Sequence, residues 1–207
     1  VANANKDKAL KNSERNKAIE YFVESANINP HDARTYRLLS QTVLTELAYD
    51  LKNGPKKDES RENYNARLQN QIASVVNIAL RATNVNPADS QNWINRGLIY
   101  ENLLTLVGGA DQAAVNSYNE SLVRNPADPA THLRIGNVYL TLADIQQGAV
   151  NNPKNQNIDF VAARKQINDN LAKAEDSFKK AISLYNNFGQ ALYNLAVVYD
   201  RENKLPD

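Results

Sequence analysis

Residue types that commonly carry chemistry are sparse in this chain. Its 207 residues include no Cys and two His, His31 and His132. Two isolated imidazoles without a matched carboxylate motif do not suggest a metal site, and without Cys a thiolate metal site and a disulfide framework are both excluded. Ser, Asp and His all occur, yet no nucleophile elbow is recognisable. We therefore expect no catalytic residues, no metal and no cofactor.

Three other short motifs have an ordinary structural explanation. Gly108-Gly109 lacks the further glycines and the preceding strand of a phosphate-binding loop, so it indicates a turn. The charged run 56–62 mixes both signs and is typical of a solvated turn. Asn119-Glu120-Ser121 matches the glycosylation sequon, but it falls inside an expected helix. None of the three predicts a binding site.

Composition narrows the class of protein. With 24 basic and 23 acidic residues, the chain lacks the clustered basic excess of a nucleic-acid surface. No apolar run approaches the roughly 20 residues that span a bilayer, so we expect no direct membrane insertion. The scarcity of Gly and Pro favours an all-α fold. The absence of Met favours a processed chain or a piece of a longer one. The absence of Cys and Met, together with the many Asn residues, favours an extracytoplasmic or cell-surface location.

Four positions divide the chain at regular offsets, and we call them the stop residues. They are Pro30, Pro87, Pro126 and Asn186. Six residues after each stands a large side chain: Tyr36, Trp93, His132 and Leu192. Ten residues after each stands a small one: Ser40, Gly97, Gly136 and Ala196. Proline at such points ends one helix and suits the turn before the next.

The same stop residues also fix positions upstream. Eight residues before them lie Phe22, Ala79, Tyr118 and Phe178, and four residues further back Ala18, Val75, Ala114 and Ala174. Residues three and four apart share one face of a helix. The pattern therefore predicts pairs of helices, with small residues where the two backbones approach.

The stretch 87–126 closely resembles the tetratricopeptide pattern W-x2-L-G-x2-Y…A-x3-F…P. Trp93, Gly97, Tyr100 and Ala114 match this pattern, and Arg96 stands where it has Leu. With the other three copies, the resemblance covers nearly the whole chain. It implies an all-α solenoid of antiparallel helical hairpins that acts through protein–protein contacts.

Two of the hairpins are expected to be longer than the family's usual unit. Apolar residues continue at helical spacing through both insertions, which indicates elongated helices rather than loops. Turns are predicted at Asn53-Gly54-Pro55 and Asn151-Asn152-Pro153. Over 1–207 we expect a single solenoid: an unpaired second helix at 6–30, a long hairpin at 31–87, a short hairpin at 88–126, a long hairpin at 127–186 and an unpaired first helix at 187–207.

The unpaired helices at the two ends each present an apolar face. At one end it comprises Leu10, Ala18, Phe22 and Ser25, and at the other Leu192, Leu195, Ala196 and Tyr199. Repeat proteins normally cover such faces with a polar capping helix. Copies of the chain that join these faces head to tail would form a filament or a ring.

The resemblance also implies a concave groove, lined by the first helices. By matching position its residues are Arg34, Arg37, Gln41, Gln91, Asn95, Asn102, Arg134, Asn137, Tyr193, Asn194 and Arg201. Arg and Asn side chains there are suited to an extended peptide or its terminal carboxylate. The likeness to the family's chaperone-tail clamp is partial, because Gln41 and Ala130 depart from it.

Three functions follow from these features. The favoured one is a non-enzymatic scaffold that assembles with copies of itself. The second is a peptide-binding arm cut from a larger protein, since the chain also looks like the soluble repeat region of bacterial O-antigen-ligase-like membrane proteins. The third is the substrate-recognition arm of a glycosyltransferase. Asn95 and Asn194 match the asparagines of such arms, but Arg134 and Leu38 do not.

Overall fold

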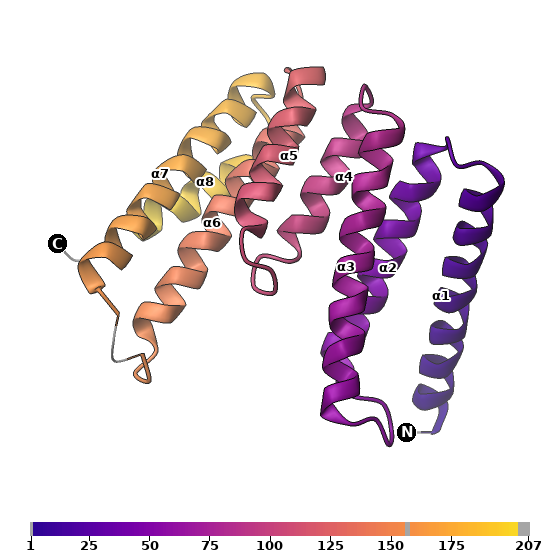
Figure 1. Ribbon diagram of the computed structural model, residues 1–207. Coiled ribbons are helices and arrows are strands. Elements are labelled where there is room, and N and C mark those ends of the chain that lie inside the picture. Colours follow the sequence, from indigo (N-terminus) through magenta and orange to yellow (C-terminus); the bar gives the residue numbers. More distant parts are fainter. Residues whose placement is uncertain (1, 156–157, 203–207) are drawn as a thin grey trace. The chain divides into compact units, whose positions relative to one another are not determined.

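The computed structural model describes residues 2–155 and 158–202, with side chains from Ser13 onward. This part of the chain forms helices and no strand (Figure 1). The helices are α1 (Ala2–Ile28), α2 (Ala33–Asn53), α3 (Arg61–Val85), α4 (Ser90–Glu101), α5 (Ala110–Arg124), α6 (Pro129–Asn151), α7 (Phe160–Leu184) and α8 (Gly189–Glu202). The all-α fold is confirmed, and so are the elongated hairpins α2–α3 and α6–α7.

An aspartate begins the helix that follows each stop proline. Asp32, Asp89 and Asp128 lie two residues after the prolines, and each side chain accepts the backbone N–H two residues further on. This capping satisfies an N–H group that the first helical turn leaves without a partner. The repeated Pro-x-Asp motif therefore sets where α2, α4 and α6 start.

The large side chain six residues after the stop closes the same turn. The hydroxyl of Tyr36 donates to the carbonyl of Pro30 at 3.3 Å, and Nε1 of Trp93 donates to that of Pro87 at 2.8 Å. His132 makes the corresponding hydrogen bond to the backbone of Pro126. Aromatic rings with a donor thus hold successive turns in one geometry.

The chain separates into two compact units, one ending at Asn102 and the other starting at Leu103. In the first unit, α2 packs against α1, α3 and α4 (Figure 1). Its buried face includes Leu39, Val43 and Leu47, and α3 buries Val75 and Ala79. Leu51 is exposed, because a polar network around Asp50 occupies this end of the α2–α3 hairpin.

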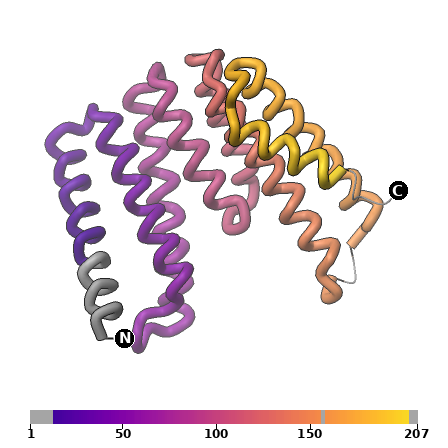
Figure 2. Tube along the Cα trace, turned by 180° about the vertical axis from the view of Figure 1, so that it is seen from behind, coloured from indigo at the N-terminus to yellow at the C-terminus, as the bar shows by residue number. Residues whose placement is uncertain are grey.

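In the second unit, α6 and α7 form the long hairpin and α8 lies against both (Figure 2). One hydrophobic cluster joins the three helices, and its buried members are Leu133, Ala143, Ile167, Leu171, Ala174, Phe178, Ala181, Ala191 and Val198. The ring of Phe178 on α7 seats over Gly136 on α6. Helix α5 packs against α6 in the same unit.

The predicted turns also appear in the structure. Gly54 follows α2 with φ +75° and Gly109 precedes α5 with φ +77°. Both values lie in the left-handed region, which glycine adopts without a steric penalty. Helix α6 ends at Asn151, directly before Asn152-Pro153. Phe160, the first residue of α7, is exposed.

Candidate protein-interaction surfaces

Helix α8 presents an apolar stripe that we call the tail face. It consists of Leu192, Ala196 and Tyr199, which are spaced by four and three residues and are all exposed. Leu192 exposes 46% of its surface. Leu195, predicted to share this face, is instead half-buried against the hydrophobic cluster of the second unit. The hydroxyl of Tyr199 lies 3.2 Å from Oε1 of Glu175, so the ring is oriented while remaining accessible.

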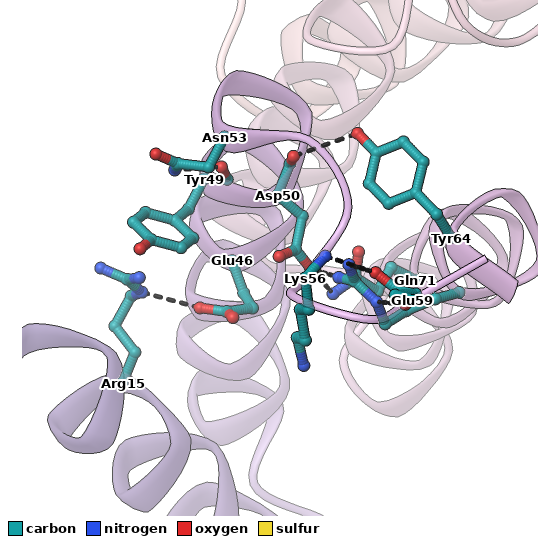
Figure 3. Close-up of polar contacts among 10 residues, drawn as sticks. Arg15, Glu46, Tyr49, Asp50, Asn53, Lys56, Glu59, Tyr64 and Gln71 are labelled. Carbon is teal, nitrogen blue, oxygen red and sulfur yellow. Dashed lines mark hydrogen bonds and ion pairs between the residues drawn. The ribbon is translucent and has the colours of Figure 1, made fainter. Parts of the chain in front are cut away.

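Helix α1 presents the other predicted surface, which we call the head face. Ala18 and Phe22 are half-buried and Ser25 is exposed, with its Oγ 3.3 Å from Oγ1 of Thr35. The side chain of Leu10 lies outside the described residues. The helix is fastened to α2 by an ion pair between Arg15 and Glu46 (2.7 Å; Figure 3).

Three more apolar residues of α1, Tyr21, Val23 and Ile28, are exposed, and the sequence reasoning missed them. Tyr21 exposes 69% of its surface and Ile28 exposes 77%. They are seven residues apart and therefore share one side of the helix. The seven-residue spacing of Tyr21 and Ile28 was the signal in the sequence that could have identified this side. It was missed because only Ala18 and Phe22 match the repeat pattern.

Several predicted groove residues of the first unit bind side chains at the neighbouring first helix. Nη1 of Arg37 donates to Oδ2 of Asp89 at 2.6 Å and to Oδ1 of Asn92 at 2.7 Å. Nε2 of Gln41 donates to Oδ1 of Asn95 at 2.8 Å. These bonds connect α2 with α4, so the side chains hold consecutive first helices together.

The second unit repeats this arrangement between α6 and α8. Nδ2 of Asn194 donates to Oδ1 of Asn137 at 2.7 Å, and Arg201 pairs with Asp144. Much of the predicted groove is therefore occupied by internal hydrogen bonds between neighbouring first helices.

The other predicted groove residues differ in their surroundings. Arg34, Gln91 and Tyr193 are exposed and Arg134 is half-buried. Nδ2 of Asn102 donates to the carbonyl of Leu98 in its own helix at 2.8 Å. Arg34, Gln91 and Tyr193 thus keep the most surface available to a partner.

A cleft of about 330 Å³ lies between α5, α6 and α7 of the second unit. Its lining includes His132, Tyr139, Lys173 and Lys180, and Nζ of Lys173 lies 5.3 Å from the centre of the Tyr139 ring. Burial lowers the pKa of His132, and the nearby ammonium group of Lys180 lowers it further. Burial raises the pKa of the Tyr139 hydroxyl. Uncharged forms of both rings are therefore favoured in this cleft.

A second cleft, of about 490 Å³, runs along the α2–α3 hairpin beside a polar network. Arg67 pairs with both Asp50 and Glu59. Gln71 donates to Asp50 at 2.8 Å, and the two residues lie in the network that Figure 3 shows. The hydrogen bond from Arg67 and that from the backbone N–H of Lys56 lower the pKa of Glu59 to about 2. The network ties the two long helices together at the end away from the Pro30 turn.

Among the residues that the structure describes, no group of three or more His, Asp and Glu side chains is arranged to hold a metal ion. Within those limits no helix combines the length and the apolar character that a bilayer crossing requires.

Comparison with known proteins identifies the fold. Neither protein-family models nor curated protein sequences give a match. Solved structures do: TTC0263, a thermophilic TPR protein of Thermus thermophilus, aligns with a TM-score of 0.61 at 18% identity, over 92% of this chain and 75% of that one. Two structures of MamA align with TM-scores of 0.56 and 0.54 at 13% and 14% identity, over 95% of this chain and 78% and 84% of theirs. The chain therefore has the fold of a tetratricopeptide-repeat protein.

Proposed function

We propose that this chain is a non-enzymatic scaffold that assembles head to tail through its terminal helices. The tail face of α8 in one copy takes up the head face of α1 in the next copy. Together the two helices rebuild one complete repeat across the junction. The observation that carries the proposal is the contact between Gly136 and Phe178, which supplies the pattern for such a repeat.

Gly136 and Phe178 occupy defined offsets from the stop residues. Gly136 lies ten residues after Pro126, and Phe178 lies eight residues before Asn186. The corresponding offsets at the two ends of the chain belong to Ala196 and Phe22. Phe178 is fully buried, whereas Phe22 is only half-buried and Ala196 is exposed. Phe22 of one copy therefore packs beside Ala196 of another, with the two helices further apart than at Gly136 and Phe178, because the Cβ of Ala196 needs space that Gly136 leaves to the ring.

In the first unit, the residue ten positions after the stop proline Pro30 is slightly larger than glycine. Ser40 lies ten residues after Pro30 and is fully buried, so the position accepts a side chain other than glycine. Ala79, eight residues before Pro87, is buried as well. A Cβ at this offset is thus accommodated where the residue eight before the next stop is small, and opposite Phe22 it requires a wider spacing of the two helices.

The apolar residues supply the driving force for association. Burial of a large apolar side chain contributes roughly 1.5–3 kcal/mol, and Phe22, Leu192 and Tyr199 all retain exposed surface. Two helix faces together bury on the order of 1,000–2,000 Å², the size of a specific interface. Because the two faces differ, the contact is heterologous and continues into a ring or a filament.

The test is the molar mass of the full chain at rising concentration, by light scattering after chromatography. We expect the mass to increase with concentration, and Ala196→Glu to abolish the increase because a carboxylate would be buried in the junction. Val161→Glu is the matched control, since Val161 is exposed on α7 outside both faces. A monomer at every concentration, or an Ala196→Glu variant that associates like the parent chain, refutes the proposal.

A second candidate function is the binding of an extended peptide by the first unit. Arg34 and Gln91 both lie four residues after a stop proline, on α2 and α4, and both are exposed. A guanidinium beside an amide is suited to a peptide carboxylate. Binding of an acidic peptide that is lost in Arg34→Gln, in a chain that stays monomeric, would favour this function over self-assembly.

A further inference from the structure

One hydrogen bond recurs between consecutive first helices in both units. Nε2 of Gln41 donates to Oδ1 of Asn95, and Nδ2 of Asn194 donates to Oδ1 of Asn137. Gln41 and Asn137 lie eleven residues after their stop residues, and Asn95 and Asn194 lie eight residues after theirs. The residue at offset eleven in one repeat therefore meets the residue at offset eight in the next.

The same rule selects one pair for a junction between two copies. Offset eleven from Asn186 is Val197 on α8, and offset eight from Pro30 is Leu38 on α2. Leu38 exposes 37% of its surface and Val197 is half-buried. Both are apolar, whereas the two internal pairs joined by this hydrogen bond are amides. Val197 and Leu38 thus match each other in chemistry and differ from the residues that form the amide pairs.

A second internal contact selects another pair. Arg37, at offset seven, donates to the carboxylate of Asp89, at offset two in the next repeat. Asp89 accepts this bond while it also caps α4. At a junction the two positions are Tyr193 on α8, which exposes 70% of its surface, and Asp32, which caps α2. A phenol O–H is a suitable donor to that carboxylate.

We infer that α8 of one copy also contacts α2 of the next copy, with Val197 on Leu38 and Tyr193 on Asp32. This inference rests on the proposed head-to-tail assembly and adds a second contact, between α8 and α2, to the contact between α8 and α1. The partner it names is another copy of this chain. An apolar pair also gives specificity, because an amide placed opposite Leu38 or Val197 would lose its hydrogen bond.

The absence of Cys from the chain permits a clean cross-linking test. A mixture of the single variants Leu38→Cys and Val197→Cys should give a covalent dimer on mild oxidation, and the double variant should give a ladder of larger species. Asn137→Cys with Asn194→Cys is the positive control, because these side chains already touch within one chain. Leu38→Cys mixed with Val123→Cys is the negative control, since Val123 is exposed on α5.

A second measurement exchanges the apolar pair for the internal amide pair. Leu38→Asn alone should weaken association by about tenfold, since a buried amide would lack its partner. Leu38→Asn combined with Val197→Gln should restore it, because the two new residues reproduce the bond between Gln41 and Asn95.

The outcomes separate this inference from the proposed function. If the parent chain associates and Ala196→Glu prevents it, but no cross-link forms between positions 38 and 197 and the amide pair restores nothing, the α8–α2 contact is refuted while head-to-tail assembly stands. If the parent chain is monomeric at every concentration, both are refuted.

Discussion

Gly136 on α6 and Phe178 on α7 lie so close that a Cβ atom on Gly136 would be 2.4 Å from Cε1 of the ring. The next two ring atoms would be 2.6 and 2.8 Å away. Because the ring is fully buried, it has no free volume into which it can swing. The two helices are therefore as close here as their backbones and this ring permit.

Gly136→Ala should lower the free energy of unfolding by about 1–3 kcal/mol, the usual cost of overpacking a core. Alanine by itself favours a helix over glycine by up to about 1 kcal/mol, so the steric term must exceed that gain. Gly148→Ala, on the same helix with no atom within 4 Å of the new Cβ, should instead raise stability by about 0.5–1 kcal/mol. Urea denaturation of both variants measures the difference. Equal stability of the two would contradict the close approach.

Arg67→Ala should lower the free energy of unfolding by about 3–5 kcal/mol, because it leaves the buried carboxylate of Asp50 without its cation. Lys165→Ala removes an exposed ion pair with Asp169 and should change stability by less than about 0.5 kcal/mol. Denaturant unfolding of the two variants tests the contrast. A double variant, Arg67→Met with Asp50→Leu, should recover most of the loss, and a failure to recover it would assign the effect to packing instead of charge.

The repeat spacings predicted the helices and placed Gly136 among the small residues where two backbones approach, because both depend on local periodicity. They did not name Phe178 as the ring that lies over Gly136. The Pro-x-Asp motif that caps α2, α4 and α6 was equally readable in the sequence, since it recurs after three stop residues. These features need no knowledge of which distant residues lie opposite one another.

The occupation of the groove could not be read in this way. Sequence offsets place Arg37 and Gln41 on the groove side of α2, but the partners that they bind lie more than 50 residues further along the chain. Only the packing of α2 against α4 shows that the two side chains bind neighbouring helices. The prediction of a groove thus named residues of the first helices without showing which of them remain available to a partner.

Glu59→Gln should lower the melting temperature at neutral pH and make no difference near pH 2. The hydrogen bonds from Arg67 and the backbone of Lys56 lower the pKa of Glu59 from 4.5 to about 2, so the unfolded chain binds its proton more readily than the folded one. The contribution of Glu59 to stability is therefore fully present above about pH 5 and is lost as the pH falls toward 2. Circular dichroism melts of both chains between pH 2 and 7 follow this change. A constant difference over the whole range would refute the assigned cause.

His132 should make the chain less stable as the pH falls from 7.5 to 5.5. Burial, and then the charge of Lys180, lower the pKa of His132 below its usual 6.5. At pH values between this lowered pKa and 6.5, the unfolded chain therefore binds a proton at His132 more readily than the folded chain does. Lys180→Gln should raise the pKa of His132, which NMR can follow because the chain has only one other His.

The control for this titration is His132→Trp, which places at this position the residue that Trp93 supplies in the preceding repeat. The indole Nε1 can still donate to the carbonyl of Pro126, as that of Trp93 donates to Pro87. The slope of melting temperature against pH between 5.5 and 7.5 should therefore flatten without loss of the fold. If the slope is unchanged, groups other than His132 cause the acid sensitivity, and the ring at this position acts only by packing and by closing the turn.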